Sequence, residues 1–118
     1  MAENELQESL MDFERNRVQL LNVSAQKQQL QAQGTTLGAA LDELDGTKEK
    51  KVYKAVGNIL ILADVSKVKK ELKDQKESVD LRVKTLQKQE DTLIDKLNKL
   101  KANIEASQKG AKPAAEAK

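Results

Sequence analysis

Cysteine and histidine are absent from this 118-residue sequence, and aromatic residues are nearly absent. There is one Phe, one Tyr and no Trp. Without Cys and His the chain cannot form a disulfide, a cysteine-bearing zinc site, a cysteine nucleophile or a Ser-His-Asp triad. The shortage of aromatic side chains also argues against a thick globular core, because these residues normally fill it.

Long apolar runs and phosphate-binding loops are missing as well. No apolar run approaches the roughly 20 residues that span a bilayer, and residues 1–10 carry acids where a signal peptide would carry bases. Gly34 and Gly38 lack the Lys-Ser/Thr ending of a phosphate loop. We therefore expect a cytoplasmic protein that is not an enzyme, does not enter the membrane, and has no catalytic, cofactor or metal site.

Charged and helix-forming residues are abundant. Charged residues make up 34% of the chain, and Leu, Lys, Glu, Gln and Ala dominate, which is typical of long helices that meet along narrow apolar seams. Residues 1–45 contain three bases against eight acids, whereas residues 65–118 contain fourteen bases against nine acids. This asymmetry favours lateral pairing of the two segments. Nucleic-acid binding is disfavoured, because acids interrupt the basic half and it contains no aromatic stacking residue.

The second half carries the heptad pattern of a coiled coil. Apolar residues recur every seven positions, and a second row follows four positions after the first. The first row is Leu72, Val79, Leu86, Leu93 and Leu100, and the second is Val83, Leu97 and Ile104, interrupted at Lys76 and Glu90. Asp64 or Ser66 can cap the helix, and Gly110 with Pro113 can end it. We predict a helix over about residues 66–109 and a disordered tail over residues 111–118.

The first half predicts a helix over about residues 4–45 with a less regular seam. One row is Leu6, Phe13 and Leu20, with Leu10 between them, and another is Val23, Leu30, Leu37 and Leu44, joined by Leu41. The three-residue step between the rows is interpreted as a shift of the seam. Gly34 and Gly38 each cost a helix interior roughly 1 kcal/mol relative to Ala. This stretch is therefore either a bendable part of one helix or a turn between two, and Asp45-Gly46 ends the helix in both cases.

The middle of the chain changes to strand periodicity. β-Favouring residues flank Gly57-Asn58, which predicts a β-hairpin with a primed two-residue turn over about residues 51–65. A lone two-stranded hairpin is marginal in water, and the uncharged run 59–63 places apolar side chains on both faces of its strand. The hairpin either docks on the chain's own helices or pairs with hairpins of sister subunits. Pairing is favoured, because narrow helices offer little surface for burying a strand.

The segment KVYKAVGNILI, residues 51–61, closely resembles the central hairpin of prefoldin β subunits. The resemblance covers about residues 5–110 and includes Lys70-Glu71-Leu72, residues 81–86, Gln89-Glu90 and residues 26–28. The sequence is similar to the archaeal-type β class, because its single short hairpin differs from the longer, two-hairpin insertion of α-type subunits.

This resemblance implies a mainly α fold in which residues 1–110 form one domain. A long antiparallel two-helix coiled coil would carry a β-hairpin at its connecting end, and the hairpins would oligomerise into a β-barrel platform. The partners implied are an α-type prefoldin subunit and sister β subunits in an α2β4 hexamer, unfolded proteins captured at the coiled-coil tips without ATP, and a group II chaperonin that receives them.

Two sets of residues are expected to mediate these contacts. The expected oligomerisation residues are Val52, Tyr53, Val56, Gly57, Asn58, Ile59, Leu60, Ile61 and Leu62. The expected client-binding residues, where the helix ends meet and fray, are Leu6, Leu10, Phe13, Leu97, Leu100 and Ile104. In a fully paired coil, the second set would be ordinary seam residues.

Two other functions are compatible with the sequence. The chain could be a structural or tethering coiled coil that assembles with a fixed partner and binds no unfolded client. It could also be a homotypic helical chaperone of the cofactor-A kind, although that function would leave the β-hairpin unexplained.

Overall fold

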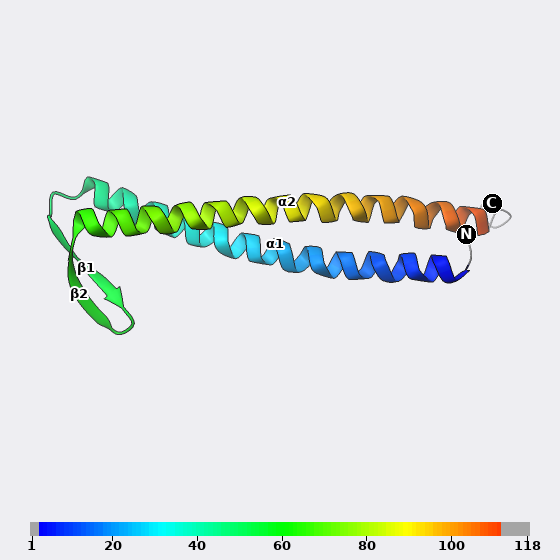
Figure 1. Ribbon diagram of the computed structural model, residues 1–118, viewed down its shortest axis with the longest axis horizontal. Helices are drawn as coiled ribbons and strands as arrows, with labels where there is room; N and C mark the ends of the chain where they lie inside the picture. The colour runs from blue at the N-terminus through cyan, green and yellow to red at the C-terminus, as the bar shows by residue number, and fades with distance from the viewer. Residues whose placement is uncertain (1–2, 112–118) are drawn as a thin grey trace. The chain divides into compact units, whose positions relative to one another are not determined.

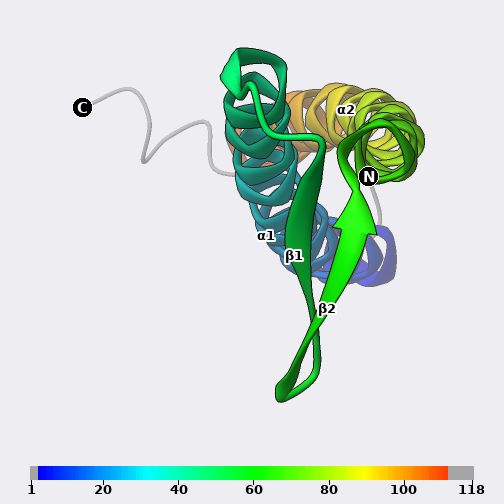
Figure 2. The ribbon, with the colours of Figure 1, turned by 90° about the vertical axis from the view of Figure 1, so that its left-hand side faces the viewer.

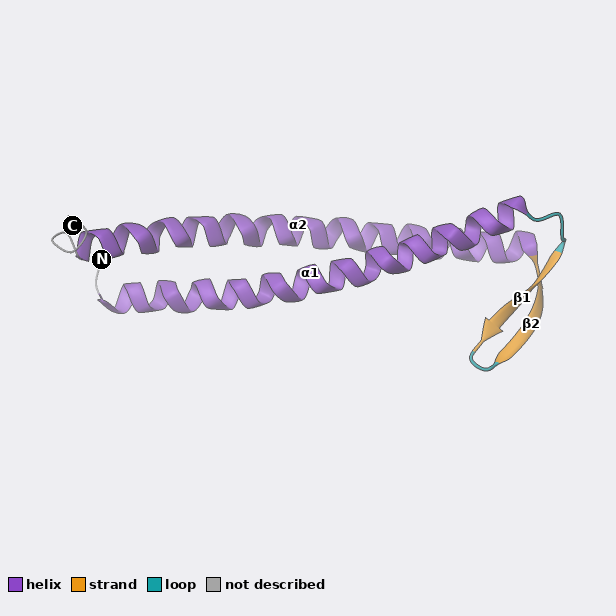
Figure 3. Cartoon of the chain, turned by 180° about the vertical axis from the view of Figure 1, so that it is seen from behind, coloured by secondary structure: helices purple, strands orange, loops and turns teal. Residues whose placement is uncertain are grey.

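The structure, a computed structural model that describes residues 3–111, consists of two long helices joined by a β-hairpin (Figures 1 and 3). The elements are α1 (Glu3–Gly46), β1 (Lys51–Val56), β2 (Ile59–Asp64) and α2 (Val65–Ala111). The predicted mainly α fold with one inserted hairpin is confirmed. The predicted tail lies outside the described residues except for Ala111, the last residue of α2.

The chain forms two compact units. The terminal unit consists of the described parts of residues 1–26 and 86–118, and the hairpin unit is Lys27–Thr85. In each unit a segment of α1 runs antiparallel to a segment of α2 (Figure 1). Neither helix, within residues 3–111, combines the length and apolarity needed to cross a bilayer.

An unbroken heptad seam runs along α1. Half-buried or buried residues follow one another in alternating steps of three and four. They are Leu6, Ser9, Phe13, Asn16, Leu20, Val23, Lys27, Leu30, Gly34, Leu37, Leu41 and Leu44. The predicted shift of the seam between Leu20 and Val23 is therefore wrong. The step of three residues between them is the ordinary step from one row of the heptad to the other. The two rows did not look continuous in the sequence because polar or small residues occupy some of their positions.

The seam of α2 follows the predicted heptads. Val79, Leu93 and Ile104 are among its most buried residues, at 5–8% exposure. Lys76 and Glu90 are half-buried at the two seam positions where the sequence interrupts the apolar row. No described side chain is fully enclosed. The apolar interior is thus a narrow seam and not a globular core.

Gly34 and Gly38 lie within the hairpin unit, where α1 approaches α2 closely. The helix continues through both residues, so the alternative of a turn at this point is not observed. A Cβ atom on Gly34 would lie 3.5 Å from Asp80 Oδ1, and one on Gly38 would lie 3.4 Å from Lys76 Cε. The two glycines therefore leave room for polar side chains of α2 at this level of the seam.

The base of the hairpin is tied directly to the helix ends. α1 ends at Gly46, as Asp45-Gly46 predicts, and the Thr47 hydroxyl accepts a hydrogen bond from the Glu49 N–H at 3.2 Å. The Val65 N–H donates to the Lys50 carbonyl at 2.9 Å. Since α2 begins immediately after Asp64, that residue, and not Ser66, occupies the N-cap position.

Candidate functional surfaces

The hairpin has a regular antiparallel register. Its paired residues run from Lys51 with Asp64 to Val56 with Ile59, and the connection is the Gly57-Asn58 turn. Gly57 has φ of 60°, and no described residue other than a glycine has positive φ. This pattern belongs to a type II′ turn with Gly at its first central position. The predicted primed turn is confirmed, and its twist matches that of the flanking strands.

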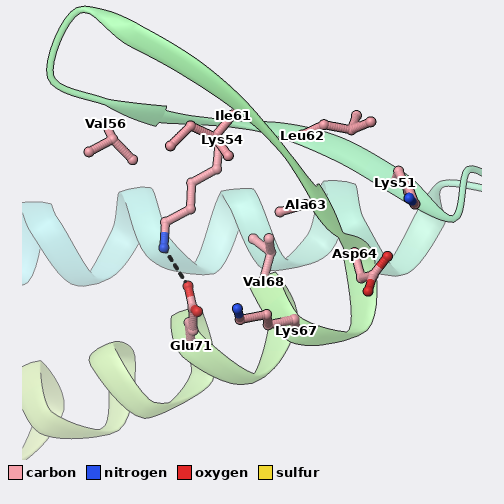
Figure 4. Close-up of a pocket in the computed structure, with 10 residues that line it drawn as sticks. All are labelled: Lys51, Lys54, Val56, Ile61, Leu62, Ala63, Asp64, Lys67, Val68 and Glu71. Carbon is pink, nitrogen blue, oxygen red and sulfur yellow. Dashed lines mark hydrogen bonds and ion pairs between the residues drawn. The ribbon is translucent and has the colours of Figure 1, made fainter.

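The register separates the hairpin side chains into two faces. One face contains Lys54, Val56 and Ile61 and lies over the first turns of α2 (Figure 4). The other contains Tyr53, Leu60 and Leu62. The turn projects away from the segments of α1 and α2 that belong to the hairpin unit (Figure 2).

The apolar side chains of the hairpin are exposed on both faces. Tyr53 is 70% exposed, Leu60 66% and Ile59 65%, while Leu62, Ile61 and Val56 are 47–53% exposed. Only Val52 and Ala63 of the two strands are half-buried. The chain's own described helices therefore do not cover the sheet, and both of its strands have an unpaired edge.

A groove of about 340 Å³ lies between the hairpin and the start of α2 (Figure 4). Ile61, Ala63 and Val68 form part of its lining. At one side, Lys54 Nζ donates to Glu71 Oε2 at 2.6 Å. The hydrogen bond from Lys54, together with its positive charge, lowers the pKa of Glu71 from its ordinary value. This ion pair links the middle of β1 to α2.

The six residues predicted to bind clients all lie in the terminal unit, but they do not share one surface. Leu6, Phe13, Leu97, Leu100 and Ile104 are half-buried or buried seam residues. Leu10, by contrast, lies outside the seam and is 44% exposed. Its grouping with the seam residues of α1 is therefore wrong.

Three exposed apolar residues of α1 were missed by the sequence analysis. Met11, Val18 and Leu21 are 61%, 45% and 57% exposed. A heptad continued in one phase from Leu6 places these three apolar residues outside the seam, which would have identified them as exposed. The assumed seam shift obscured this signal.

Polar residues cross the seam at defined places in each unit. In the terminal unit, Ser24 Oγ of α1 donates to Glu90 Oε2 of α2 at 2.5 Å. Within α2, Gln87 Nε2 donates to the other carboxylate oxygen of Glu90 at 3.3 Å. In the hairpin unit, Lys69 Nζ lies 3.0 Å from Asp45 Oδ1. Glu90, which interrupts the apolar row in the sequence, therefore makes a specific contact between the helices. Within residues 3–111 no cluster of carboxylates could hold a metal ion.

Two heptad helices on either side of an exposed β-hairpin define a class of protein, the helical hairpin with an inserted two-stranded sheet. The sequence model of the prefoldin subunit family matches residues 7–111. The chain belongs to the prefoldin family, whose members are chaperone subunits.

Its relatives include β subunits of prefoldin. The chain is 36% identical over 100 residues to prefoldin subunit beta of Pyrobaculum calidifontis, covering 84% of this chain and 80% of the relative. It is 36% identical over 101 residues to the subunit of Saccharolobus islandicus, covering 85% and 80%. The crystal structure of the prefoldin beta subunit from Thermococcus strain KS-1 matches with a TM-score of 0.81 and 34% identity, covering 87% of this chain and 91% of that one. The resemblance found in the sequence is confirmed.

Proposed function

We propose that this chain is the β-class subunit of a nucleotide-independent holding chaperone. It assembles through the hairpin with an α-type subunit and sister β subunits, as an α2β4 hexamer built on a β-barrel. It captures unfolded polypeptides at the terminal unit and delivers them to a group II chaperonin in the cytoplasm. The observation that supports this function most directly is the exposed apolar hairpin on a chain that belongs to the prefoldin family.

Assembly through the hairpin is favoured by hydrogen bonding and by apolar burial. Each edge strand presents unpaired backbone N–H and C=O groups, which a strand of another subunit can satisfy. The face with Tyr53, Leu60 and Leu62 would become buried when such a sheet closes. Burial contributes roughly 25 cal/mol for each Å² of apolar surface removed from water. The Lys54–Glu71 ion pair would present the hairpin to its partner in a restrained direction.

The shallow seam supports the proposal that the terminal unit captures clients. Leu6, Phe13 and Leu97 are only half-buried, and helix ends open locally at low free-energy cost. Transient opening would expose an apolar strip to a non-native chain. Several subunits around one client would strengthen weak individual contacts through effective concentration, and no nucleotide is required for release.

The proposed function can be tested by co-expressing the chain with an α-type prefoldin subunit. We expect a stable hetero-oligomer whose mass corresponds to two α and four β subunits, and we expect the complex to suppress aggregation of a guanidinium-unfolded test protein. A complex that forms but does not suppress aggregation would favour the tethering alternative. Failure to form any complex would contradict the assembly proposal.

A second experiment tests where clients bind. Replacing Leu6, Leu10 and Phe13 with Ser should weaken the holding of unfolded protein while leaving the oligomer intact, because assembly is assigned to the hairpin. Light scattering would measure the oligomer, and aggregation of the test protein would measure holding. An intact oligomer with undiminished holding would exclude these residues as the capture site.

A further inference from the structure

α1 carries a second apolar surface within the terminal unit, outside its seam. We call Met11, Val18 and Leu21, with Leu10 at its edge, the outer stripe. When Leu6 is heptad position a, Met11 and Val18 occupy position f, directly opposite the seam, and Leu21 occupies the adjoining position b. Each of the four side chains is 44–61% exposed. The stripe therefore follows one face of the helix.

The helix pairing does not require this stripe. Leu6, Phe13 and Leu20 already occupy the seam of the same segment. The corresponding positions of α2 in the terminal unit are mostly polar. Position f is occupied by Lys88, Asp95 and Ala102, and position b by Asp91, Asn98 and Glu105. A solvated coiled-coil helix normally has this polar composition on its outer face. At the f and b positions of the terminal unit, α1 departs from this composition with large apolar side chains that the described residues leave exposed.

The surface beside the outer stripe is negatively charged. Five acids lie between residues 3 and 14, namely Glu3, Glu5, Glu8, Asp12 and Glu14, and the first base is Arg15. Arg15 forms an ion pair with Asp12 at 3.4 Å, and Arg17 forms one with Glu14 at 2.6 Å. Glu3 and Glu5 also complement the helix dipole in the first turn, whereas Glu8 lies beyond it, one helical turn from Met11. None of Glu3, Glu5 and Glu8 forms an ion pair among the described residues.

We propose that the outer stripe is a docking surface for segments of non-native polypeptide that combine apolar with basic side chains. Apolar side chains of the client bury against Met11, Val18 and Leu21, and the flexible Met11 adapts to different shapes. Lysine or arginine side chains of the client pair with Glu8, one helical turn from Met11, and with Glu3 nearer the start of the helix. The proposal rests on the proposed chaperone function and names the kind of client segment it selects. Docking on this face leaves the seam closed, so capture here does not require the helices to separate.

The apolar part of the proposal is tested with the assembled complex and a variant carrying Met11→Gln, Val18→Gln and Leu21→Gln. Glutamine preserves helix propensity and removes apolar contact area. The probe is a fluorescent peptide of alternating leucine and lysine, measured by anisotropy. We expect its affinity to fall by about tenfold or more, with unchanged complex mass and helical circular dichroism. The matched control changes two exposed apolar residues of α2, Leu81→Gln and Ile94→Gln, and should retain the wild-type affinity.

The electrostatic part is tested by a second peptide in which glutamate replaces lysine. The wild-type complex should prefer the lysine peptide, and this preference should decrease at high salt. The variant Glu3→Gln, Glu5→Gln and Glu8→Gln should lose the preference while the outer stripe remains intact. Equal binding of the two peptides by the wild type would overturn the selection of basic segments.

The outcomes distinguish this proposal from the proposed function. The wild type suppresses aggregation if the chaperone function is correct. If the outer-stripe variant then binds the lysine peptide as tightly as the wild type does, the stripe is not the docking surface, although the chaperone function stands. If the stripe variant instead abolishes a self-association seen in the wild type, the stripe is a contact between copies of the chain, and the proposal is overturned. A wild-type complex that neither binds peptide nor suppresses aggregation would overturn the chaperone function itself.

Discussion

At the scale of single residues, Gly34 and Gly57 occupy opposite backbone environments. Gly57 has φ of 60°, in the left-handed region, with no atom within 4 Å of the place where a Cβ would be. Any cost of a side chain there arises from the backbone itself. Gly34 is helical, and its hypothetical Cβ would make ordinary contacts with Val79 and Asp80 at 3.6 and 3.5 Å. The same substitution should therefore have opposite effects at the two positions.

We expect Gly34→Ala to raise the free energy of unfolding by about 0.5–1 kcal/mol, because alanine loses less backbone entropy in a helix. Gly57→Ala should instead destabilise the hairpin by about 1–2 kcal/mol through left-handed strain. Thermal unfolding followed by circular dichroism measures the first effect, and the concentration dependence of assembly measures the second. A lower melting temperature for Gly34→Ala would show that the seam cannot accept the added methyl group.

At the scale of elements, local sequence patterns predict the helices and the hairpin turn because both depend on nearby residues. Heptad spacing and Gly57-Asn58 are sufficient for the fold class. The continuous seam of α1 was not predicted, because Ser9, Asn16, Lys27 and Gly34 occupy its positions and lack the apolar signal. The role of Glu90 could not be predicted either, since its partner Ser24 is 66 residues distant in the sequence. The outer stripe can be separated from the seam only when the phase of the heptad is known.

The Ser24–Glu90 hydrogen bond should couple the two helices energetically. Ser24→Ala leaves the half-buried carboxylate without this donor and should cost about 0.5–1.5 kcal/mol. In a Glu90→Leu background the same change should cost much less, because the acceptor is gone. Urea unfolding of the four proteins gives the coupling free energy. Ser9→Ala, at another half-buried seam serine of α1, serves as the control and should have little effect; equal costs for both serines would rule out a specific contact.

The ion pair between the hairpin and α2 should depend on pH. Since Lys54 lowers the pKa of Glu71 in the folded chain, the stabilisation is present above the ordinary value of 4.5 and is lost as the pH falls through the folded pKa. A carbon-detected NMR titration should place the midpoint for the Glu71 carboxyl below 4.5 in the wild type. Lys54→Met should move the midpoint upward. Identical midpoints in the two proteins would show that the ion pair does not form in solution.

At the scale of the whole molecule, the helices pair within the chain while the hairpin remains uncovered among the described residues. Pairing and assembly should therefore be separable by mutation. We expect Leu60→Lys with Leu62→Lys to dissociate the hetero-oligomer, because both residues lie on the face that would be buried in a closed sheet and charged side chains disfavour such burial. Helical circular dichroism should be largely retained.

Analytical ultracentrifugation of the variant with the α-type partner measures the mass of the complex and so shows whether assembly is lost. Leu81→Lys is the control, because Leu81 is 58% exposed on α2, similar to the hairpin residues, but lies outside the sheet. The control should assemble as the wild type does. An unchanged mass for the Leu60/Leu62 variant would mean that the hairpin is not the assembly element.

The narrow seam has a calorimetric consequence. Unfolding raises the heat capacity mainly by exposing apolar surface to water, by about 12–15 cal/mol/K per residue in globular proteins. Here even the most buried apolar residues, such as Leu93 at 5% exposure, retain some contact with solvent. The heat capacity increment per residue should therefore fall below the globular range, and the free energy of unfolding should curve only gently with temperature. A chain of this kind keeps much the same stability over a wide span of temperatures.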